Sequence, residues 1–309
     1  MEYENRCRQS QRGKYDCLLF DLDDTLYPLS SGIAIQCRNN IGDYLVEKLG
    51  IEENKVSALC NLLYKNYGTT MAGLKAIGYD FDYDDYHSFV HGRLPHENLK
   101  PDPVLRQLLL SLPIRKVVSS SSVLQKLSPS LCLSNSWIFL AAIQVFTNAD
   151  KVHAAKVLKK LRLEDCFEGI ICFETLNPPS SSSVTETSSQ IFDIVEHFAR
   201  PDTGGIELPK TPILCKPSLE AMEYALRIAN IDPQRTVFFD DSVRNVQSGK
   251  RIGLHTVLVG TAHKVKGADY ALESIHNIRE ALPGLWEEAE KSDGIRYSGK
   301  VAMETSVTA

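Results

Sequence analysis

Short apolar runs alternate with segments of helical spacing along most of this chain. This alternation is typical of proteins in which parallel strands are joined by helices. We therefore expect an α/β fold with a Rossmann-like, doubly wound parallel sheet, whose ligands bind at the carboxyl ends of the strands. The strand candidates are Leu18–Phe20, Ile114–Val118, Gly169–Phe173, Thr236–Phe239 and Thr256–Val259.

The segment 28–98 differs from the rest, because it shows helical spacing and almost no strand signal. It follows the first apolar run directly, so we expect a small helical cap inserted after the first strand, able to close over a site and exclude water. The core would then comprise 15–27 and 99–290. We also expect a flexible leader at 1–14, a Ser/Pro-rich surface loop at 177–210 and a disordered tail at 291–309.

The segment 118–144 is an atypical insertion in this pattern. Removing it would join 115–117 to 145–148 as one continuous strand with its polar turn, and insertions are rarely tolerated inside such an element. The codons of Val118 begin with GT and one codon of Gln144 is CAG, which are the bases expected at the ends of an intron. A retained intron or gene-model error is one interpretation, and a lineage-specific loop is the other.

The composition is that of an ordinary globular protein, with 43% hydrophobic and 24% charged residues. The net charge of -5 argues against a nucleic-acid partner. The apolar stretch Trp137–Ile143 is too short to span a membrane, which needs about 20 residues. None of the eight cysteines forms a C-x-x-C pair, which indicates a reduced compartment, the cytoplasm or the nucleus.

Acidic residues follow the first apolar run. Asp21 and Asp23 are two positions apart at the end of a predicted strand, so we expect them on the same face. Two adjacent carboxylates repel each other unless a cation lies between them, and Mg²⁺ would bind such oxygens together with a substrate phosphate. The alternative is an acidic turn in which Asp24 or Thr25 only caps the following backbone.

Three further polar clusters fall where the predicted fold places strand ends or helix starts. They would supply an oxyanion-binding hydroxyl, a cation and more metal ligands beside the first carboxylates. These clusters are Thr147 with Asn148, then Lys216, and then Asp240 with Asp241.

Two features of the predicted cap carry candidate chemistry. Aromatic and hydroxyl groups around a glycine can meet a substrate, although a helix joint with Thr69 as N-cap explains the same pattern. His87 and His91 are four residues apart on a predicted helix and could bind a metal, but without a third ligand nearby packed histidines are the favoured interpretation. The candidate substrate-binding residues of the cap are Tyr67, Gly68, Thr69 and Thr70.

The motifs together resemble those of a known family. Four segments closely resemble the four motifs of the haloacid dehalogenase (HAD) superfamily of phosphohydrolases. They are D-x-D-D-T-L at 21–26, Thr-Asn at 147–148, a lysine opening a helix at 216 and D-D-S at 240–242. The cap, with Y-G-T-T at 67–70, is similar to the pyrimidine 5'-nucleotidase branch of fungi and plants.

The resemblance implies roles for individual residues. Asp21 would be the nucleophile and Asp23 the general acid and base. Thr147 and Lys216 would bind the transferring oxygens, and Asn148 the substrate. Mg²⁺ would be held by Asp21, the Asp23 backbone carbonyl and Asp241, with Asp240 near or in its shell and Asn245 orienting a metal-bound water.

The implied function is a Mg²⁺-dependent phosphatase that hydrolyses a small phosphorylated metabolite, such as a pyrimidine nucleoside 5'-monophosphate, through an aspartyl-phosphate. Dehalogenases of the superfamily lack an acid at the position of Asp23, so this residue favours phosphoryl transfer over cleavage of a carbon–halogen bond. Two-component receiver domains lack a cap, which argues against that class. The oligomeric state stays open.

The alternative function is a catalytically impaired splice or gene-model isoform with a non-catalytic role, because the insertion enters the strand that positions Thr147. The site would be preserved if Ile143–Phe146 replaced Ile114–Val118 as the strand while the insertion loops out.

Overall fold

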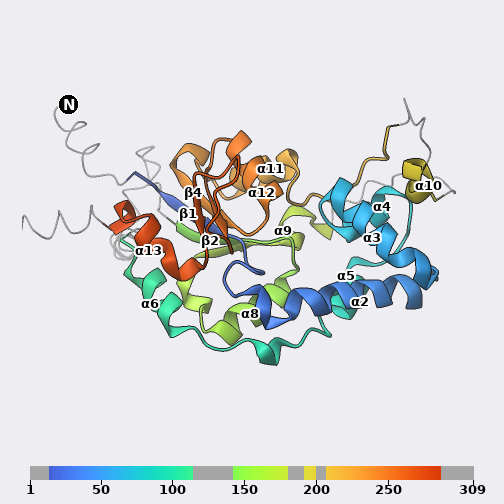
Figure 1. Cartoon of the computed structure of the whole chain (residues 1–309), viewed down its shortest axis with the longest axis horizontal. Coiled ribbons are helices and arrows are strands. Elements are labelled where there is room, and N and C mark those ends of the chain that lie inside the picture. Colours follow the sequence, from blue (N-terminus) through green and yellow to red (C-terminus); the bar gives the residue numbers. More distant parts are fainter. Residues whose placement is uncertain (1–13, 114–141, 180–190, 200–206, 287–309) are drawn as a thin grey trace, which may run out of the picture.

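The protein contains a six-stranded sheet in which every neighbouring pair of strands is parallel. The computed structural model describes residues 14–113, 142–179, 191–199 and 207–286. The strand order is β3-β2-β1-β4-β5-β6 (Figure 1), which confirms the predicted α/β, Rossmann-like architecture. The strands are β1 (Cys17–Phe20), β2 (Ala142–Phe146), β3 (Gly169–Ile171), β4 (Thr236–Asp240), β5 (His255–Val259) and β6 (Tyr270–Leu272).

Helices cover both faces of the sheet because successive residues of β1 point to opposite sides. Leu18 and Phe20 lie in one apolar cluster with residues of α6, α8 and α13, whereas Leu19 lies in another with residues of α11. In Figure 1, α11 and α12 lie above the sheet, and α6 and α8 lie below it. The helices are α6 (Pro103–Ser111), α8 (Lys151–Leu161), α9 (Phe173–Leu176), α11 (Leu219–Ile228), α12 (Val243–Arg251) and α13 (Ile278–Ala281).

The segment between β1 and α6 is helical, as the sequence predicts, and has its own apolar cluster around Tyr44, Leu63 and Val90. Figure 1 places it beside the sheet rather than on either face. No helix of the described ranges is long and apolar enough to cross a bilayer. The helices of this cap are α2 (Ile33–Glu47), α3 (Glu53–Tyr67), α4 (Thr70–Ala76) and α5 (Tyr83–Val90). Single 3-10 turns occur at Leu29–Ser31, His96–Asn98, Glu164–Cys166, Pro233–Arg235 and Ile275–Asn277.

The predicted surface loop at 177–210 contains a helix, α10 (Ile194–Ala199). Ile194 is buried in the apolar cluster of the cap, and the backbone N–H of Phe192 donates to the carbonyl of Ile77 at 2.9 Å. The periodicity at 191–198 therefore marks a short element that packs on the cap. The rest of that loop at 180–190 and 200–206, like the predicted leader up to residue 13 and the predicted tail, lies outside the described residues.

The last three residues of the atypical insertion form the start of β2. Ala142, Ile143 and Gln144 pair with Cys17, Leu18 and Leu19 of β1, and the Ile143 side chain is fully buried. This register corresponds to the alternative in which Ile143–Phe146, rather than Ile114–Val118, forms the strand before Thr147. Residues 114–141, including the predicted strand at Ile114–Val118, lie outside the described part of the chain.

Candidate active site

The candidate site lies where the carboxyl ends of three adjacent strands meet the cap. Asp21 follows β1, Thr147 follows β2 and Asp240 ends β4, and β1 is the central strand of the three. A cavity of about 500 Å³ lies between these strand ends and the cap helices. The sequence-predicted residues on its wall are Asp21, Asp23, Thr69, Thr70, His87, His91, Thr147, Asn148, Lys216, Asp241 and Asn245.

Lys216 connects two of the carboxylates. Its side chain is 1% exposed, and Nζ donates to Asp21 Oδ1 at 2.7 Å, to Asp240 Oδ2 at 2.8 Å and to the carbonyl of Phe146 at 2.7 Å. Burial alone would lower the pKa of Lys216, but the two carboxylates outweigh burial and raise it. The lysine is therefore a fixed cation beside Asp21.

Three carboxylates are close enough to share one metal ion. Oxygen atoms of Asp21, Asp240 and Asp241 all lie within 4.8 Å of one another. Burial and the neighbouring acids raise the pKa of Asp21, with Lys216 opposing them, and burial and Asp240 likewise raise that of Asp241. One lysine thus leaves this group under-compensated, and an all-oxygen set of this kind fits Mg²⁺.

The Asp23 carboxylate does not join that cluster. Its Oδ1 accepts a hydrogen bond from Tyr27 Oη at 2.5 Å and lies 2.7 Å from His153 Nε2. Removal from water favours the protonated acid, but the charge and hydrogen bond of His153 outweigh this effect and lower the pKa of Asp23 to about 2. The Asp23 side chain, for which the resemblance implies the role of general acid and base, is thus held by His153 on α8.

His153 is oriented by a second histidine. His96 Nδ1 lies 3.0 Å from the carbonyl of Leu94, so this nitrogen carries a proton and donates it. Burial lowers the pKa of His96, which favours its neutral form with Nε2 as an acceptor. His153 Nδ1, at 3.1 Å from that nitrogen, then donates, and a proton is shared between His153 Nε2 and Asp23.

Asn148 and Asn245 hold other residues of the site. The Asn148 amide makes two hydrogen bonds with the backbone of Lys216. Its Oδ1 accepts from the Lys216 nitrogen at 2.8 Å, and its Nδ2 donates to the Lys216 carbonyl at 3.0 Å. Asn245 Nδ2 donates to both oxygens of Asp240, at 3.0 and 3.1 Å. Both amides therefore position site residues, whereas the sequence suggests contacts with substrate and with a metal-bound water.

The four predicted cap residues divide into two pairs. Thr69 and Thr70 line the cavity, and Thr69 is also the N-cap of α4, accepting a hydrogen bond from the Ala72 nitrogen at 3.1 Å. Tyr67 and Gly68 do not line the cavity. A Cβ on Gly68, whose φ is +92°, would lie 2.5 Å from the Lys216 carbonyl oxygen, so this glycine allows the cap to approach the core.

Sequence reasoning missed Tyr27 and His153 as partners of Asp23. Tyr27 is adjacent to the first motif, and its spacing of four residues from Asp23 is the only signal for it. His153 lies on the buried side of α8, where the apolar pattern gives no sign of a polar contact.

Part of the chain is similar to a known protein family and to a curated protein. A family model described as HAD-hydrolase-like matches residues 213–280. Phosphate metabolism protein 8 of Saccharomyces cerevisiae is 26% identical over 258 residues, which are 83% of this chain and 64% of the yeast protein. The chain thus spans less than two thirds of the length of this curated relative.

Solved structures of HAD proteins also match this chain, at TM-scores below 0.5. A HAD phosphatase from Thermococcus onnurineus has a TM-score of 0.45 and 16% identity, covering 85% of this chain and 96% of its own. CbbY from Rhodobacter sphaeroides, in complex with phosphate, has a TM-score of 0.43 and 17% identity. The match covers 88% of this chain and 99% of the CbbY chain. The segment matched by the family model contains Lys216, Asp240 and Asp241, so this match agrees with the resemblance of the motifs to the HAD superfamily. The matches do not distinguish a branch within the superfamily.

Proposed function

We propose that this chain is a Mg²⁺-dependent phosphatase that hydrolyses a small phosphomonoester through a phosphorylated Asp21. The observation that carries the proposal is the buried contact between Lys216 Nζ and Asp21 Oδ1, made at the carboxyl end of the central strand and on the wall of a cavity. A lysine in this position neutralises a phosphoryl oxygen and keeps the Asp21 carboxylate oriented for attack.

In the first step, an oxygen of Asp21 forms a bond to phosphorus and the bond from phosphorus to the leaving alkoxide breaks. The alkoxide takes a proton from the pair formed by Asp23 and His153. The Thr147 hydroxyl, on the same cavity wall, donates to a phosphoryl oxygen, and the positive charge of Lys216 stabilises the phosphoryl group.

In the second step, water attacks phosphorus and the bond from phosphorus to Asp21 breaks, which releases phosphate. The pair formed by Asp23 and His153 receives the proton of that water, so both residues return to their initial state. Closure of the cap over the cavity would exclude other water during the transfer.

Mg²⁺ would be held by the carboxylates of Asp21 and Asp241, with Asp240 beside them and Asn245 fixing Asp240. When bound, it supplies positive charge that reduces the repulsion between these carboxylates and an incoming phosphate.

The substrate class that we propose is a small phosphorylated metabolite, with pyrimidine nucleoside 5'-monophosphates as the first candidates. The cavity of about 500 Å³ has the size of a small-molecule site. The nucleotide preference itself comes from the similarity of the cap to the 5'-nucleotidase branch. The six cysteines in the described ranges are free thiols, which supports a reduced compartment such as the cytoplasm.

Nothing in the described residues supports the alternative of an impaired isoform. The Thr147 backbone nitrogen donates to the Ile171 carbonyl at 2.9 Å, and β2 pairs with β1 up to Val145. The backbone at Thr147 is therefore held by the neighbouring strand β3 even with the insertion present.

The proposal is tested by phosphate release from p-nitrophenyl phosphate, followed by a panel of nucleotides and sugar phosphates. We expect activity that requires Mg²⁺ and is lost in Asp21→Asn, while Asp84→Asn, a change to an exposed aspartate of α5, keeps it. Equal activity in Asp21→Asn and the unaltered chain would overturn the mechanism.

A further inference from the structure

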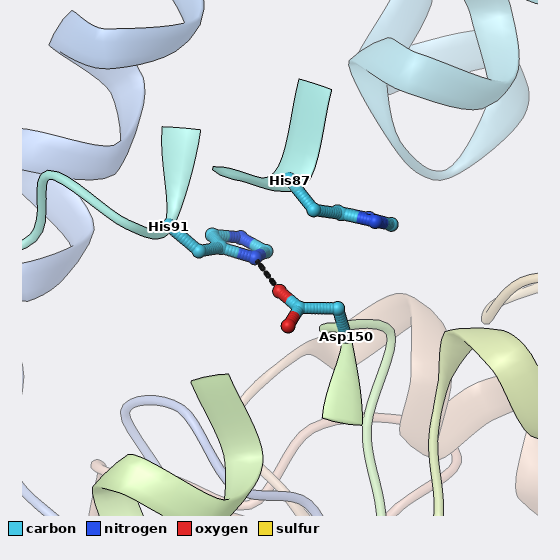
Figure 2. A group of neighbouring side chains, drawn as sticks. All are labelled: His87, His91 and Asp150. Atoms are coloured by element: carbon cyan, nitrogen blue, oxygen red, sulfur yellow. Dashed lines mark hydrogen bonds and ion pairs between the residues drawn. The ribbon is translucent and has the colours of Figure 1, made fainter. Parts of the chain in front are cut away.

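A second cluster of potential metal ligands lies at the boundary between cap and core. His87 and His91 are one turn apart on α5 and its C-terminal end, so they share a face. Asp150, the N-cap residue of α8, completes the group from the core side. Figure 2 shows the three side chains together, with Asp150 directed at His91. The third ligand that the sequence alone does not reveal is therefore supplied by a residue 59 positions after His91.

The side chains of this cluster are partly or fully withdrawn from solvent. The rings of His87 and His91 stack with centroids 5.5 Å apart and an angle of 16° between their planes. His91 Nδ1 lies 2.5 Å from Asp150 Oδ2, whereas the ring nitrogens of His87 have no hydrogen-bond partner among the described residues. His87 is only 8% exposed overall, and its side chain lines the cavity, so its unpartnered ring nitrogens are available to a ligand there.

The donor set favours a different ion from that of the carboxylate cluster. Two imidazoles and one carboxylate suit Zn²⁺, Co²⁺, Ni²⁺ or Cu²⁺, whereas Mg²⁺ prefers oxygen ligands alone. One ligand atom from each residue lies within 4.8 Å of the others, so small side-chain rotations would bring them around one ion. His87 and His91 also line the cavity, which leaves a further coordination position facing it.

We propose that His87, His91 and Asp150 form a second metal site that takes a Zn²⁺-class ion and links the cap to the core. The ion would take the place of the proton that His91 shares with Asp150, and that proton would go to solvent. Asp150 Oδ1 is fixed by the His153 backbone nitrogen at 2.9 Å, so the core ligand is already oriented. An ion bound here ties α5 to α8 and slows the cap movement that admits substrate and releases product.

The test uses the full chain, stripped of metal and then saturated with Mg²⁺ to fill the carboxylate cluster. Co²⁺ is titrated while the visible absorption of the Co²⁺ ion is recorded, and Zn²⁺ is then added in competition. We expect one Co²⁺ per chain, displaced by one Zn²⁺. Because loss of a residue that only supports a ligand commonly weakens metal binding about 10- to 100-fold, we expect His87→Gln and His91→Gln to weaken it at least about 10-fold.

Two further variants make the result specific. Asp150→Asn removes the carboxylate but keeps a side chain that can cap α8, so it should weaken Co²⁺ binding without unfolding the protein. His263→Gln, a change to an exposed histidine elsewhere, should bind Co²⁺ as the unaltered chain does. Equal Co²⁺ affinity in the three ligand variants and the unaltered chain, or a single Co²⁺ site that only Asp241→Asn removes, would overturn the proposal. Because the readout is metal absorption, it is independent of the proposed phosphatase activity.

Discussion

Lys216 Nζ lies 2.7 Å from Asp21 Oδ1, and the two residues are 195 positions apart in the sequence. The contact joins the end of β1 to the segment between α10 and α11. Because Lys216 also bonds Asp240, one buried cation holds the ends of β1 and β4 in a fixed relation. The same side chain therefore stabilises the core and, under the proposed function, takes part in the chemistry.

Replacing Lys216 by Met should reduce both properties. The substitution keeps the apolar stem but leaves two buried carboxylates without their cation, and removing one partner of a buried pair commonly costs about 3–5 kcal/mol. We expect urea unfolding to show a loss of this size and phosphate release to fall below detection. A variant that is as stable as the unaltered chain would contradict the assigned role of the lysine.

The approach of the cap to the core should depend on Gly68. An alanine there combines a strained φ of +92° with a Cβ only 2.5 Å from the Lys216 carbonyl oxygen. Gly50→Ala is a matched control, because Gly50 also has a positive φ of +68° but nothing within 4 Å of its Cβ position. Positive φ costs a non-glycine residue about 1–2 kcal/mol, so Gly50→Ala should lose roughly this much stability. Gly68→Ala should lose more, because its Cβ also meets the Lys216 carbonyl oxygen. Only Gly68→Ala should also lose turnover, measured with p-nitrophenyl phosphate; equal turnover in the two variants would show that this contact does not seat the cap.

How much of the site the sequence predicts depends on the element that carries each residue. Asp21, Thr147 and Asp240 were predictable because each follows an apolar run, and parallel strands bring their carboxyl ends to one edge. His153 was not, because its contact with Asp23 depends on how α8 packs against the sheet. The end of the predicted strand places Asn148 at the site, but the sequence does not predict that its amide binds the Lys216 backbone.

The fold shows the same division. The alternating pattern predicts the parallel sheet, since burial on both faces gives apolar runs. It leaves open whether Ile114–Val118 or Ile143–Phe146 forms the second strand, and the structure places Ile143 in the core position beside Leu18. Two apolar segments competed for one strand position, and only pairing in three dimensions selects between them.

The register of β2 leads to a prediction for the insertion. Ala142–Phe146 forms the strand that precedes Thr147 in the full chain, and in a chain lacking 118–144 the residues 115–117 would take the place of 142–144. The two chains should therefore have equal turnover numbers. Parallel assays and thermal melting of the two purified chains would measure this. Activity confined to the shorter chain would revive the impaired-isoform interpretation, and transcripts that all carry the segment would exclude a retained intron.

One stability effect should depend on pH through Asp269. Burial would raise the pKa of this carboxyl, but hydrogen bonds from Lys250 Nζ at 2.7 Å and the Thr256 backbone nitrogen at 2.9 Å outweigh it and lower the pKa. A depressed folded pKa gives stability that is complete above the unfolded value, about 3.9, and is lost as the pH falls through the folded value.

Asp269→Asn should therefore be less stable than the unaltered chain at pH 7, by up to about 1 kcal/mol for a partly exposed pair. The difference should persist at pH 5 and shrink below pH 4, when urea unfolding is compared across these conditions. A difference that grows as the pH falls would contradict the sign of the pKa shift.

The central claim is that Asp21 becomes covalently phosphorylated during turnover. Acid quenching of the chain within the first turnover with p-nitrophenyl phosphate and Mg²⁺, followed by mass spectrometry of its peptides, measures this directly. We predict one added phosphoryl group on the peptide that contains Asp21, and none in Asp21→Asn. Turnover without any phosphorylated peptide, or with the phosphoryl group on another residue, would contradict the account.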